Sequence, residues 1–312
     1  MSITRNCLIG FAIGDAMGVP IEFEKRERLV KKPVTSMLGY GSYDVPEGTW
    51  SDDTSMTLAT MDSIIELGEI NYNDIADKFC AWINNAKYTA TNEVFDIGTT
   101  TKFALMRYWN DKVDAIKCGG SGINENGNGS LMRMLPIALY CSYQKLEEDE
   151  IYDIVKNISS ITHSHEISIM GCYIYVLYMI NLLNGNDKLE SYSIIKKVNY
   201  SKYFSDNTIN EYNRLLKTNI HECHIDDISS SGYVRNTLEA VIWVILNTNS
   251  YSEAIIGAIN LGEDTDTIGA ITGSIAGLLY GYESIPKKWI NKMKKIDYLE
   301  EISRKYGGIF LS

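Results

Sequence analysis

The chain has 312 residues, of which 45% are hydrophobic and 22% are charged. This is the composition of a globular protein that is long enough to bury a substantial core. A net charge of −11, with no stretch dense in Lys and Arg, argues against nucleic-acid binding. The six cysteines are scattered without a C-x-x-C pair, and the glycine-broken N-terminal run does not predict a signal peptide. We therefore expect a reduced, soluble, cytoplasmic protein.

Helical periodicity dominates the chain. The best β candidate, residues 34–38, is weak, and the polar stretch at residues 184–232 still contains paired apolar residues that favour some helix. Helices are predicted, in chain order, at residues 73–83 behind an Asn73 cap, from about Glu148 to Ile158, at 167–183, from Thr237 to Leu246 and at 268–281. The sequence therefore predicts a mainly α protein.

Two of these predicted helices have unusual surfaces. Residues 167–183 are uncharged and lie at the lower limit of membrane-spanning length, but they contain glycine, asparagine and three tyrosines. This favours a buried central helix over a membrane span. Gly269, Gly273 and Gly277 recur every four residues, so one face of that helix lets another backbone approach closely. We expect this second helix to be tightly packed at the centre of the protein.

Two short acidic clusters stand directly before apolar, helix-like runs, at residues 51–54 (Ser-Asp-Asp-Thr) and 264–267 (Asp-Thr-Asp-Thr). One such cluster alone is typical of a helix cap. Four carboxylates that met in space would need a cation to stay ionised, and oxygen ligands favour a hard ion such as Mg²⁺, Mn²⁺ or Ca²⁺. An EF-hand starting at Asp264 is excluded, because its fifth and twelfth positions are Ile268 and Ile275. The matched pair therefore predicts a metal site built from both ends of one domain, residues 1–312.

Closely spaced glycines lie between the two clusters, at residues 119–122 and again around Asn128. Such loops turn backbone N–H groups toward anions, but this one lacks the lysine of a P-loop. A surface turn and a phosphate cradle both stay open. Arg133, which follows the loop, is expected either to hold a carboxylate or to touch a ligand.

The order of the motifs resembles the ADP-ribosylglycohydrolase family, in particular its dinitrogenase-reductase-activating glycohydrolase type. The matching segments run in family order over nearly the full chain: residues 14–23 (GDAMGVPIEF), 50–54 (WSDDT), 95–98 (FDIG), 128–133 (NGSLMR), 162–165 (THSH), 232–234 (GYV) and 260–269 (NLGEDTDTIG). Any single motif could arise by chance, whereas the ordered set is specific. The resemblance implies an all-α fold, a compact single-domain orthogonal helical bundle with a binuclear metal site at its centre.

The resemblance also assigns residues to the site. Two Mg²⁺ or Mn²⁺ ions would be held by Ser51, Asp52, Asp53, Asp264, Asp266 and Thr267. Proton transfer would fall to Asp53 or Glu22, with Asp96 beside the distal ribose. ADP-ribose would contact Gly127, Asn128, Gly129, Ser130, Met132, His163 and Tyr233. The glycine loop would hold the diphosphate, and Tyr233 would lie against the nucleoside.

The implied activity is metal-dependent hydrolysis that removes ADP-ribose from a modified protein side chain, arginine above all, and so reverses an ADP-ribosyltransferase. A metal pair can orient the ribose hydroxyls and supply a nucleophilic water, while carboxylates stabilise oxocarbenium-like charge. Three alternatives stay open. They are hydrolysis of O-linked ADP-ribose on serine or in O-acetyl-ADP-ribose, hydrolysis of another nucleotide or sugar phosphate, and a non-catalytic binding or structural role. No membrane partner or self-association is indicated, so a monomer is expected.

Three positions depart from the family pattern. Thr99 stands where relatives often carry Asn, Glu263 replaces a glycine before the D-x-D-T motif, and Glu166 follows T-H-S-H where proline is common. None of them removes an expected metal ligand. An effect of these changes is expected on the leaving-group side of the site.

Overall fold

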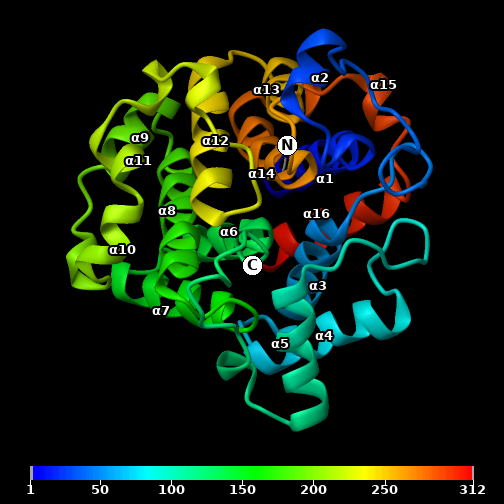
Figure 1. Cartoon of the computed structure of the whole chain (residues 1–312). Helices are drawn as coiled ribbons and strands as arrows, with labels where there is room; N and C mark the ends of the chain where they lie inside the picture. The colour runs from blue at the N-terminus through cyan, green and yellow to red at the C-terminus, as the bar shows by residue number, and fades with distance from the viewer. Residues whose placement is uncertain (1–2, 311–312) are drawn as a thin grey trace.

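The structure is a computed structural model that describes residues 3–310, and between these residues it contains no β-strand (Figure 1). The α-helices, in chain order, are α1 (Ile3–Gly18), α2 (Arg26–Lys31), α3 (Asp52–Leu67), α4 (Tyr72–Asn85), α5 (Thr99–Asp111), α6 (Leu135–Gln144), α7 (Glu148–Ser160), α8 (Glu166–Leu183), α9 (Lys188–Ile195), α10 (Asp206–Glu211), α11 (Asn213–Lys217), α12 (Val234–Asn247), α13 (Tyr251–Ile259), α14 (Thr265–Tyr280), α15 (Lys287–Ile290) and α16 (Ile296–Ile309). Their apolar side chains form one buried cluster. The all-α prediction is confirmed, and the assignment of one domain to residues 1–312 stays a prediction.

The two ends of the chain meet at the centre, where α1 and α14 pack against each other (Figure 1). A methyl group added at Gly14 would lie 2.0 Å from the carbonyl oxygen of Gly269, and one added at Gly269 would lie 2.4 Å from that of Gly14. Backbones approach this closely only where both helices lack side chains. The predicted central glycine helix is confirmed. Its partner ridge, at Gly10, Gly14 and Gly18, was also readable in the sequence.

Helix α8 is long and apolar enough to cross a membrane by length and composition, and 72% of it is buried inside the structure. It packs against α6, α7, α9 and α12. Two polar groups of α8 have partners there: the Tyr175 hydroxyl lies 2.9 Å from Ser274 Oγ on α14, and the Ile167 carbonyl accepts from the Tyr212 hydroxyl at 2.6 Å. Contacts with other helices therefore account for its apolar composition, as the prediction of a buried helix expected.

Two local predictions are wrong. Residues 34–38 form a loop, because the backbone N–H and C=O of Val34 are both bonded to the side-chain amide of Asn260, each at 2.8 Å, instead of to a neighbouring strand. Helix α4 is capped by Asn71, whose Oδ1 accepts from the Asp74 N–H at 3.0 Å. The side chain of Asn73 instead accepts from Ala115. The polar stretch at 184–232 does contain helix, as α9, α10 and α11.

Candidate functional site

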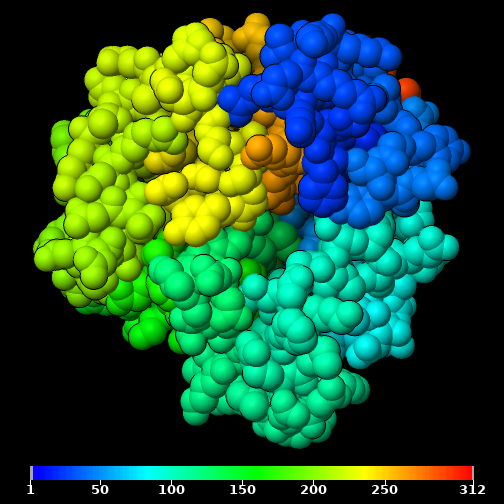
Figure 2. Space-filling model, in the orientation of Figure 1, coloured from blue at the N-terminus to red at the C-terminus, as the bar shows by residue number. Residues whose placement is uncertain are grey.

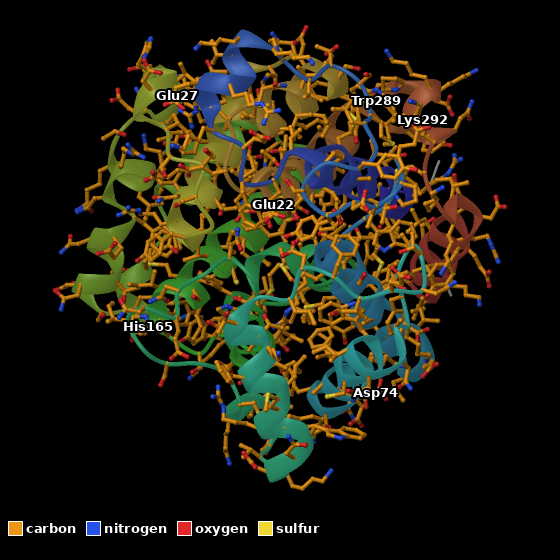
Figure 3. All side chains as sticks on the ribbon, turned by 45° about the vertical axis from the view of Figure 1, so that its right-hand side comes forward. Glu22, Glu27, Asp74, His165, Trp289 and Lys292 are labelled. Carbon is orange, nitrogen blue, oxygen red and sulfur yellow. The ribbon has the colours of Figure 1, made fainter. Side chains whose placement is uncertain are left out.

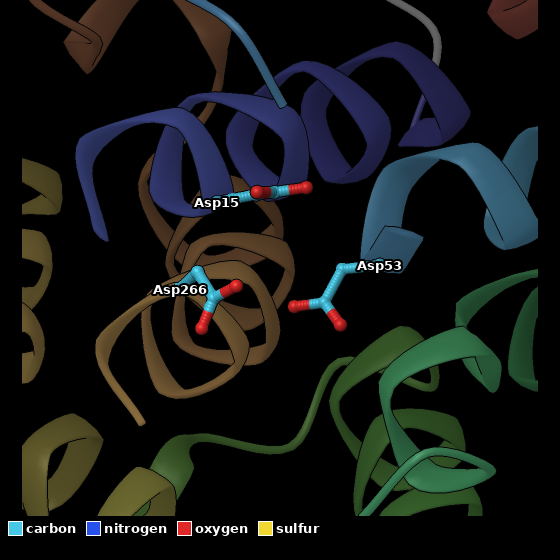
Figure 4. A group of neighbouring side chains, drawn as sticks. All are labelled: Asp15, Asp53 and Asp266. Carbon is cyan, nitrogen blue, oxygen red and sulfur yellow. The ribbon is translucent and has the colours of Figure 1, made fainter. Parts of the chain in front are cut away.

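Three helix ends bring carboxylates together at the centre of the molecule. Asp15 lies in the last turn of α1, Asp53 in the first turn of α3, and Asp266 in the first turn of α14 (Figure 4). Figure 4 shows the carboxylates of Asp53 and Asp266 pointing toward each other across the gap between their helices. Helix N-termini favour negative charge, so α3 and α14 support these acids electrostatically. The two acidic clusters of the sequence therefore meet in space.

Asp15 is a site residue that the sequence analysis missed. Its Oδ1 accepts from the Ser51 N–H at 2.9 Å, and its Oδ2 accepts from the N–H and the hydroxyl of Thr54 at 3.1 and 2.5 Å. These bonds fix the start of α3, and hence Asp53, relative to α1. The available signal was a single carboxylate in the otherwise apolar run of residues 7–19.

Two groups of three carboxylates lie close enough to share a cation. One side-chain oxygen from each of Asp15, Asp53 and Asp266 lies within 4.8 Å of the other two, and the same holds for Glu22, Asp96 and Asp266. Asp53 Oδ2 and Glu22 Oε2 are buried, with no hydrogen-bond partner among residues 3–310. Unpaired buried carboxylate oxygens in this number suit a hard divalent cation. The donor set therefore fits a metal centre, in which Asp266 belongs to both groups.

The other predicted ligands surround this centre. Ser51 caps α3, with its Oγ accepting from the Asp53 N–H at 3.3 Å, and the Thr267 hydroxyl donates to Asp53 Oδ1 at 3.3 Å. Asp264 Oδ2 accepts from the Asn128 side chain at 2.7 Å. The first cluster thus serves as a helix cap and as part of the acidic centre at the same time.

Burial raises the pKa of every carboxyl group in the centre. Desolvation is the main cause for each, and repulsion from neighbouring acids adds to it for Asp53 and Asp266, whose pKa values lie well above the usual range. The pKa of Glu22 is raised to about 9 and that of Asp15 to about 7. At neutral pH the centre therefore holds protons unless a cation neutralises it.

A tyrosine and three strained residues border the acids. Burial and the charges of the nearby Asp96 and Glu22 carboxylates raise the pKa of the Tyr43 hydroxyl, a proximity that the sequence did not reveal. Phe23, Asp96 and Glu263 have positive φ angles of 66°, 53° and 59°. The Phe23 N–H donates to the Glu263 carbonyl at 2.7 Å. Left-handed backbone at non-glycine residues is costly and gathers at functional sites.

An open cleft of about 200 Å³ lies over the centre. Figure 2 shows a hollow where the N-terminal, teal, yellow and orange segments meet, and Figure 3 places Glu22 near the middle of the molecule. The cleft is lined by Glu22, Asp52, Asp96, Gly98, Thr99, Thr100, Thr101, Gly127, Asn128, Gly129, Met132, His163, Asp264 and Thr267. The remaining predicted site residues, which do not line it, are Ser51, Asp53, Ser130, Tyr233 and Asp266.

The two glycine runs have different roles. At residues 119–122 the backbone turns around the Glu125 carboxylate, which accepts from the Gly122 N–H at 2.8 Å, so this run is a turn. Residues 127–129 line the cleft, held by a bridge between Gly127 and Tyr233 and by the Asn128 N–H, which donates to the Gly232 carbonyl at 3.0 Å. A side chain at Gly129 would strike the ring of His163, at 2.8 Å. The second run is therefore the one placed to meet a ligand.

Ser130 and Tyr233 lie beside the cleft. The Ser130 hydroxyl accepts from Ser159 at 2.9 Å and contacts Cys172, so it is directed into the core. The Tyr233 ring is half-buried, with the guanidinium of Arg235 5.3 Å from its centroid.

A buried relay fixes the protonation of His163. Arg133 Nη2 donates to Thr162 Oγ1 at 2.8 Å, and Thr162 Oγ1 lies 2.8 Å from His163 Nδ1. Because arginine can only donate, we assign the proton of the threonine hydroxyl to the bond with Nδ1, and the neutral ring then carries its single N–H on Nε2. Burial, together with the charge of Arg133, lowers the pKa of His163 to about 3. His163 therefore presents a neutral ring with an Nε2–H donor beside Gly127 and Gly129.

Arg133 fulfils neither expectation from the sequence. It is fully buried, does not line the cleft and has no carboxylate partner among the described residues. Its guanidinium lies 4.7 Å from the centroid of the Phe79 ring, and its Nε and Nη1 have no hydrogen-bond acceptor in that part of the chain.

The three departures from the family pattern lie in different environments. Thr99 lines the cleft. Glu263 is exposed and does not line the cleft; its backbone carbonyl accepts from the Phe23 N–H. Glu166 accepts from the hydroxyls of Ser205 and Thr208 at 2.7 and 2.9 Å, so it ties α8 to α10 and does not line the cleft.

The fold and site together define an all-α enzyme with a buried, carboxylate-rich centre beneath an open cleft. The sequence profile of the ADP-ribosylglycohydrolase family matches residues 2–310, and the chain belongs to this family of hydrolytic enzymes. It is 33% identical to the ADP-ribosylarginine hydrolase Tri1 of Serratia proteamaculans, over 96% of this chain and 77% of that protein. It is 26% identical to the ADP-ribosyl-[dinitrogen reductase] glycohydrolase of Rhodospirillum rubrum, over 91% and 88%. A solved ADP-ribosylglycohydrolase-related protein complex has the same fold, with a TM-score of 0.83, 23% identity and coverage of 99% and 98%.

Proposed function

We propose that the protein is a divalent-cation-dependent hydrolase that releases ADP-ribose from ADP-ribosylated arginine side chains of a target protein. The observation that carries this proposal is the arrangement of two groups of three carboxylates that share Asp266, with unpaired oxygens on Asp53 and Glu22. Both groups lie beneath a cleft lined by a glycine loop. The arginine linkage is supported by two relatives, from Serratia proteamaculans and Pseudomonas putida, that are named ADP-ribosylarginine hydrolases.

Two Mg²⁺ or Mn²⁺ ions would be held around Asp53 and Asp266, with Asp52, Asp264, Ser51 and Thr267 as further oxygen donors. When bound, they supply Lewis-acid charge and a nucleophilic water at neutral pH. Asp15 keeps Asp53 in place through its three bonds to the start of α3.

Different residues of the cleft would bind different parts of the substrate. The N–H groups of Gly127 and Gly129 and the Nε2–H of His163 would bind the diphosphate, while Asp96, Asp52 and Asp264 would face the distal ribose. Glu22 has a pKa raised to about 9, mainly by burial and by the charge of Asp96, so it carries a proton at neutral pH. That value belongs to the cation-free centre; in the loaded enzyme, Glu22 would act as the general acid in its protonated form and give the proton to the departing nitrogen of the arginine when the glycosidic bond breaks.

We further propose that the protein acts as a cytoplasmic monomer on modified proteins, without a membrane or nucleic-acid partner. The six cysteines are all free, which suits a reducing compartment. The net charge of −11 disfavours nucleic acid.

A panel of linkages tests the proposal. The purified protein with Mg²⁺ is offered arginine-linked ADP-ribosyl protein, serine-linked ADP-ribosyl peptide and O-acetyl-ADP-ribose, and the initial rate of ADP-ribose release is measured for each. Fastest release from the arginine conjugate is the expected result. Faster release from either O-linked compound would show that arginine is not the preferred linkage. Tight binding of ADP-ribose without release from any conjugate would show a binding protein and not an enzyme.

A further inference from the structure

Three aromatic rings form a connected group, and two of them belong to residues adjacent in sequence to Glu22 and Asp96, which line the cleft. The ring centroids of Phe23 and Tyr43 are 6.3 Å apart, and those of Tyr43 and Phe95 are 5.0 Å apart. Both pairs of rings are tilted, with interplanar angles of 56° for Phe23 and Tyr43 and 47° for Tyr43 and Phe95. The function described above uses none of these rings.

The backbone conformation of Phe23 keeps its side chain exposed to solvent. Its side chain is 69% exposed although phenylalanine is normally buried. Its φ of 66° is a strained, left-handed conformation, which is fixed by the bond of its N–H to the Glu263 carbonyl. A strained residue that presents a large apolar ring to water is expected where that ring meets a ligand.

The rings are joined to the reacting end of the cleft. Phe23 directly follows Glu22 and Phe95 directly precedes Asp96, and the Tyr43 ring contacts the rings of both phenylalanines. The glycine loop, by contrast, contacts His163 and Thr101. A ligand whose diphosphate lies at the glycine loop, and whose ribose reaches the carboxylates, therefore places its leaving group beside the three rings.

Aromatic faces next to two carboxylates favour a planar cation. The ring quadrupole attracts a guanidinium group, and nearby negative charge adds to this attraction. We propose that Phe23, Tyr43 and Phe95 form the subsite for the guanidinium group and side-chain stem of the target arginine. This inference rests on the proposed function and deepens it, because it names the residues that select the leaving group.

The test compares two ring replacements with a matched control. Phe23→Leu and Phe95→Leu keep apolar bulk but remove the π face, whereas Phe23→Tyr keeps it. Trp109→Leu is the control, because Trp109 is 49% exposed on α5 and lines a different hollow with Cys80 and Ile83. For each protein, kcat/KM on arginine-linked ADP-ribosyl protein and the Kd of free ADP-ribose are measured.

Each leucine variant is expected to lower kcat/KM about tenfold through KM, with the Kd of ADP-ribose unchanged and with Phe23→Tyr close to the wild type. If the wild-type protein cleaves the arginine conjugate but the leucine variants have the same kcat/KM as the Trp109→Leu control, the proposed subsite is wrong and the proposed function stands. A weaker Kd for ADP-ribose would also overturn the subsite, since the rings would then bind the adenine or support the cleft. A wild-type protein inactive on the arginine conjugate would overturn the proposed function together with the subsite.

Discussion

One buried oxygen atom, Oδ2 of Asp53, has no hydrogen-bond donor in the described part of the chain, although Oδ1 of the same carboxylate accepts from Thr267. Burial and the neighbouring acids oppose its ionisation. Such an atom is destabilising by itself and becomes favourable when a cation binds to it. Asp53 is therefore the residue at which loss of a single charge should matter most.

We expect Asp53→Asn to lower the rate of ADP-ribose release by at least about a thousandfold, because the amide keeps the shape but cannot replace the charge at the centre. Asp111→Asn, which changes an exposed aspartate at the end of α5, should leave the rate unchanged. The rate is measured on the arginine conjugate with saturating Mg²⁺. Comparable rates for the two variants would show that Asp53 is not part of the proposed site.

The relay from Arg133 through Thr162 to His163 makes a second prediction. In Thr162→Val the hydroxyl that fixes the proton of His163 is lost, so the ring samples both tautomers and the Kd of ADP-ribose should rise about tenfold. Thr162→Ser should retain tight binding. Nitrogen chemical shifts of His163 report the tautomer directly, and an unchanged Nε2–H form in Thr162→Val would contradict the relay.

At the scale of helices, the α1–α14 contact positions the site, because α1 carries Asp15 and α14 carries Asp266. The two backbones touch at Gly14 and Gly269. A change in the spacing of these helices would move two carboxylates of the same group. Stability and site geometry are therefore coupled through this one interface.

Gly14→Ala should destabilise the protein by about 3 kcal/mol or more, since the new methyl group would lie 2.0 Å from a carbonyl oxygen and the helices would have to separate. Gly308→Ala is the matched control. Gly308 lies in α16 with no atom within 4 Å of an added methyl, so alanine should be neutral or slightly stabilising there. Urea unfolding measures both changes, and equal free energies of unfolding for the two variants would contradict the close contact.

Local patterns in the sequence predicted five of the sixteen α-helices of residues 3–310, namely α4, α7, α8, α12 and α14, together with the two acidic clusters. The glycine spacing at Gly269 and the two acidic clusters predicted a central helix and a meeting of the chain ends, because both are periodic or repeated signals. Tyr43 and the Arg133 relay were not predictable, since their partners lie far away in sequence. The weak β candidate at residues 34–38 is a loop for the same reason: a side chain 226 residues away is bonded to its backbone.

At the scale of the whole molecule, the raised pKa values link stability to pH. In the unfolded chain Asp and Glu titrate near 3.8 and 4.5, whereas folded Asp15 and Glu22 keep their protons up to about 7 and about 9. Between these limits the folded state binds more protons than the unfolded state. The free energy of unfolding therefore falls as the pH rises through this window, unless a cation replaces the protons.

We expect the melting temperature in EDTA to decrease from about pH 5 to about pH 9, and Mg²⁺ to raise it more at the upper pH than at the lower. Glu22→Gln removes the group with the pKa of about 9, so its melting temperature should fall less with pH. Differential scanning calorimetry measures all of these values. A melting temperature that rises with pH in EDTA and does not respond to Mg²⁺ would contradict this coupling.

The most direct test of cation-dependent hydrolysis is the release of free ADP-ribose from an arginine-ADP-ribosylated protein, measured with Mg²⁺, with EDTA, and with EDTA followed by excess Mg²⁺. We predict release with Mg²⁺, loss of release with EDTA and full recovery on readdition, because the carboxylates of the centre need a cation to act together. Equal release in the presence and absence of EDTA, or no release under any of the three conditions, would contradict the account.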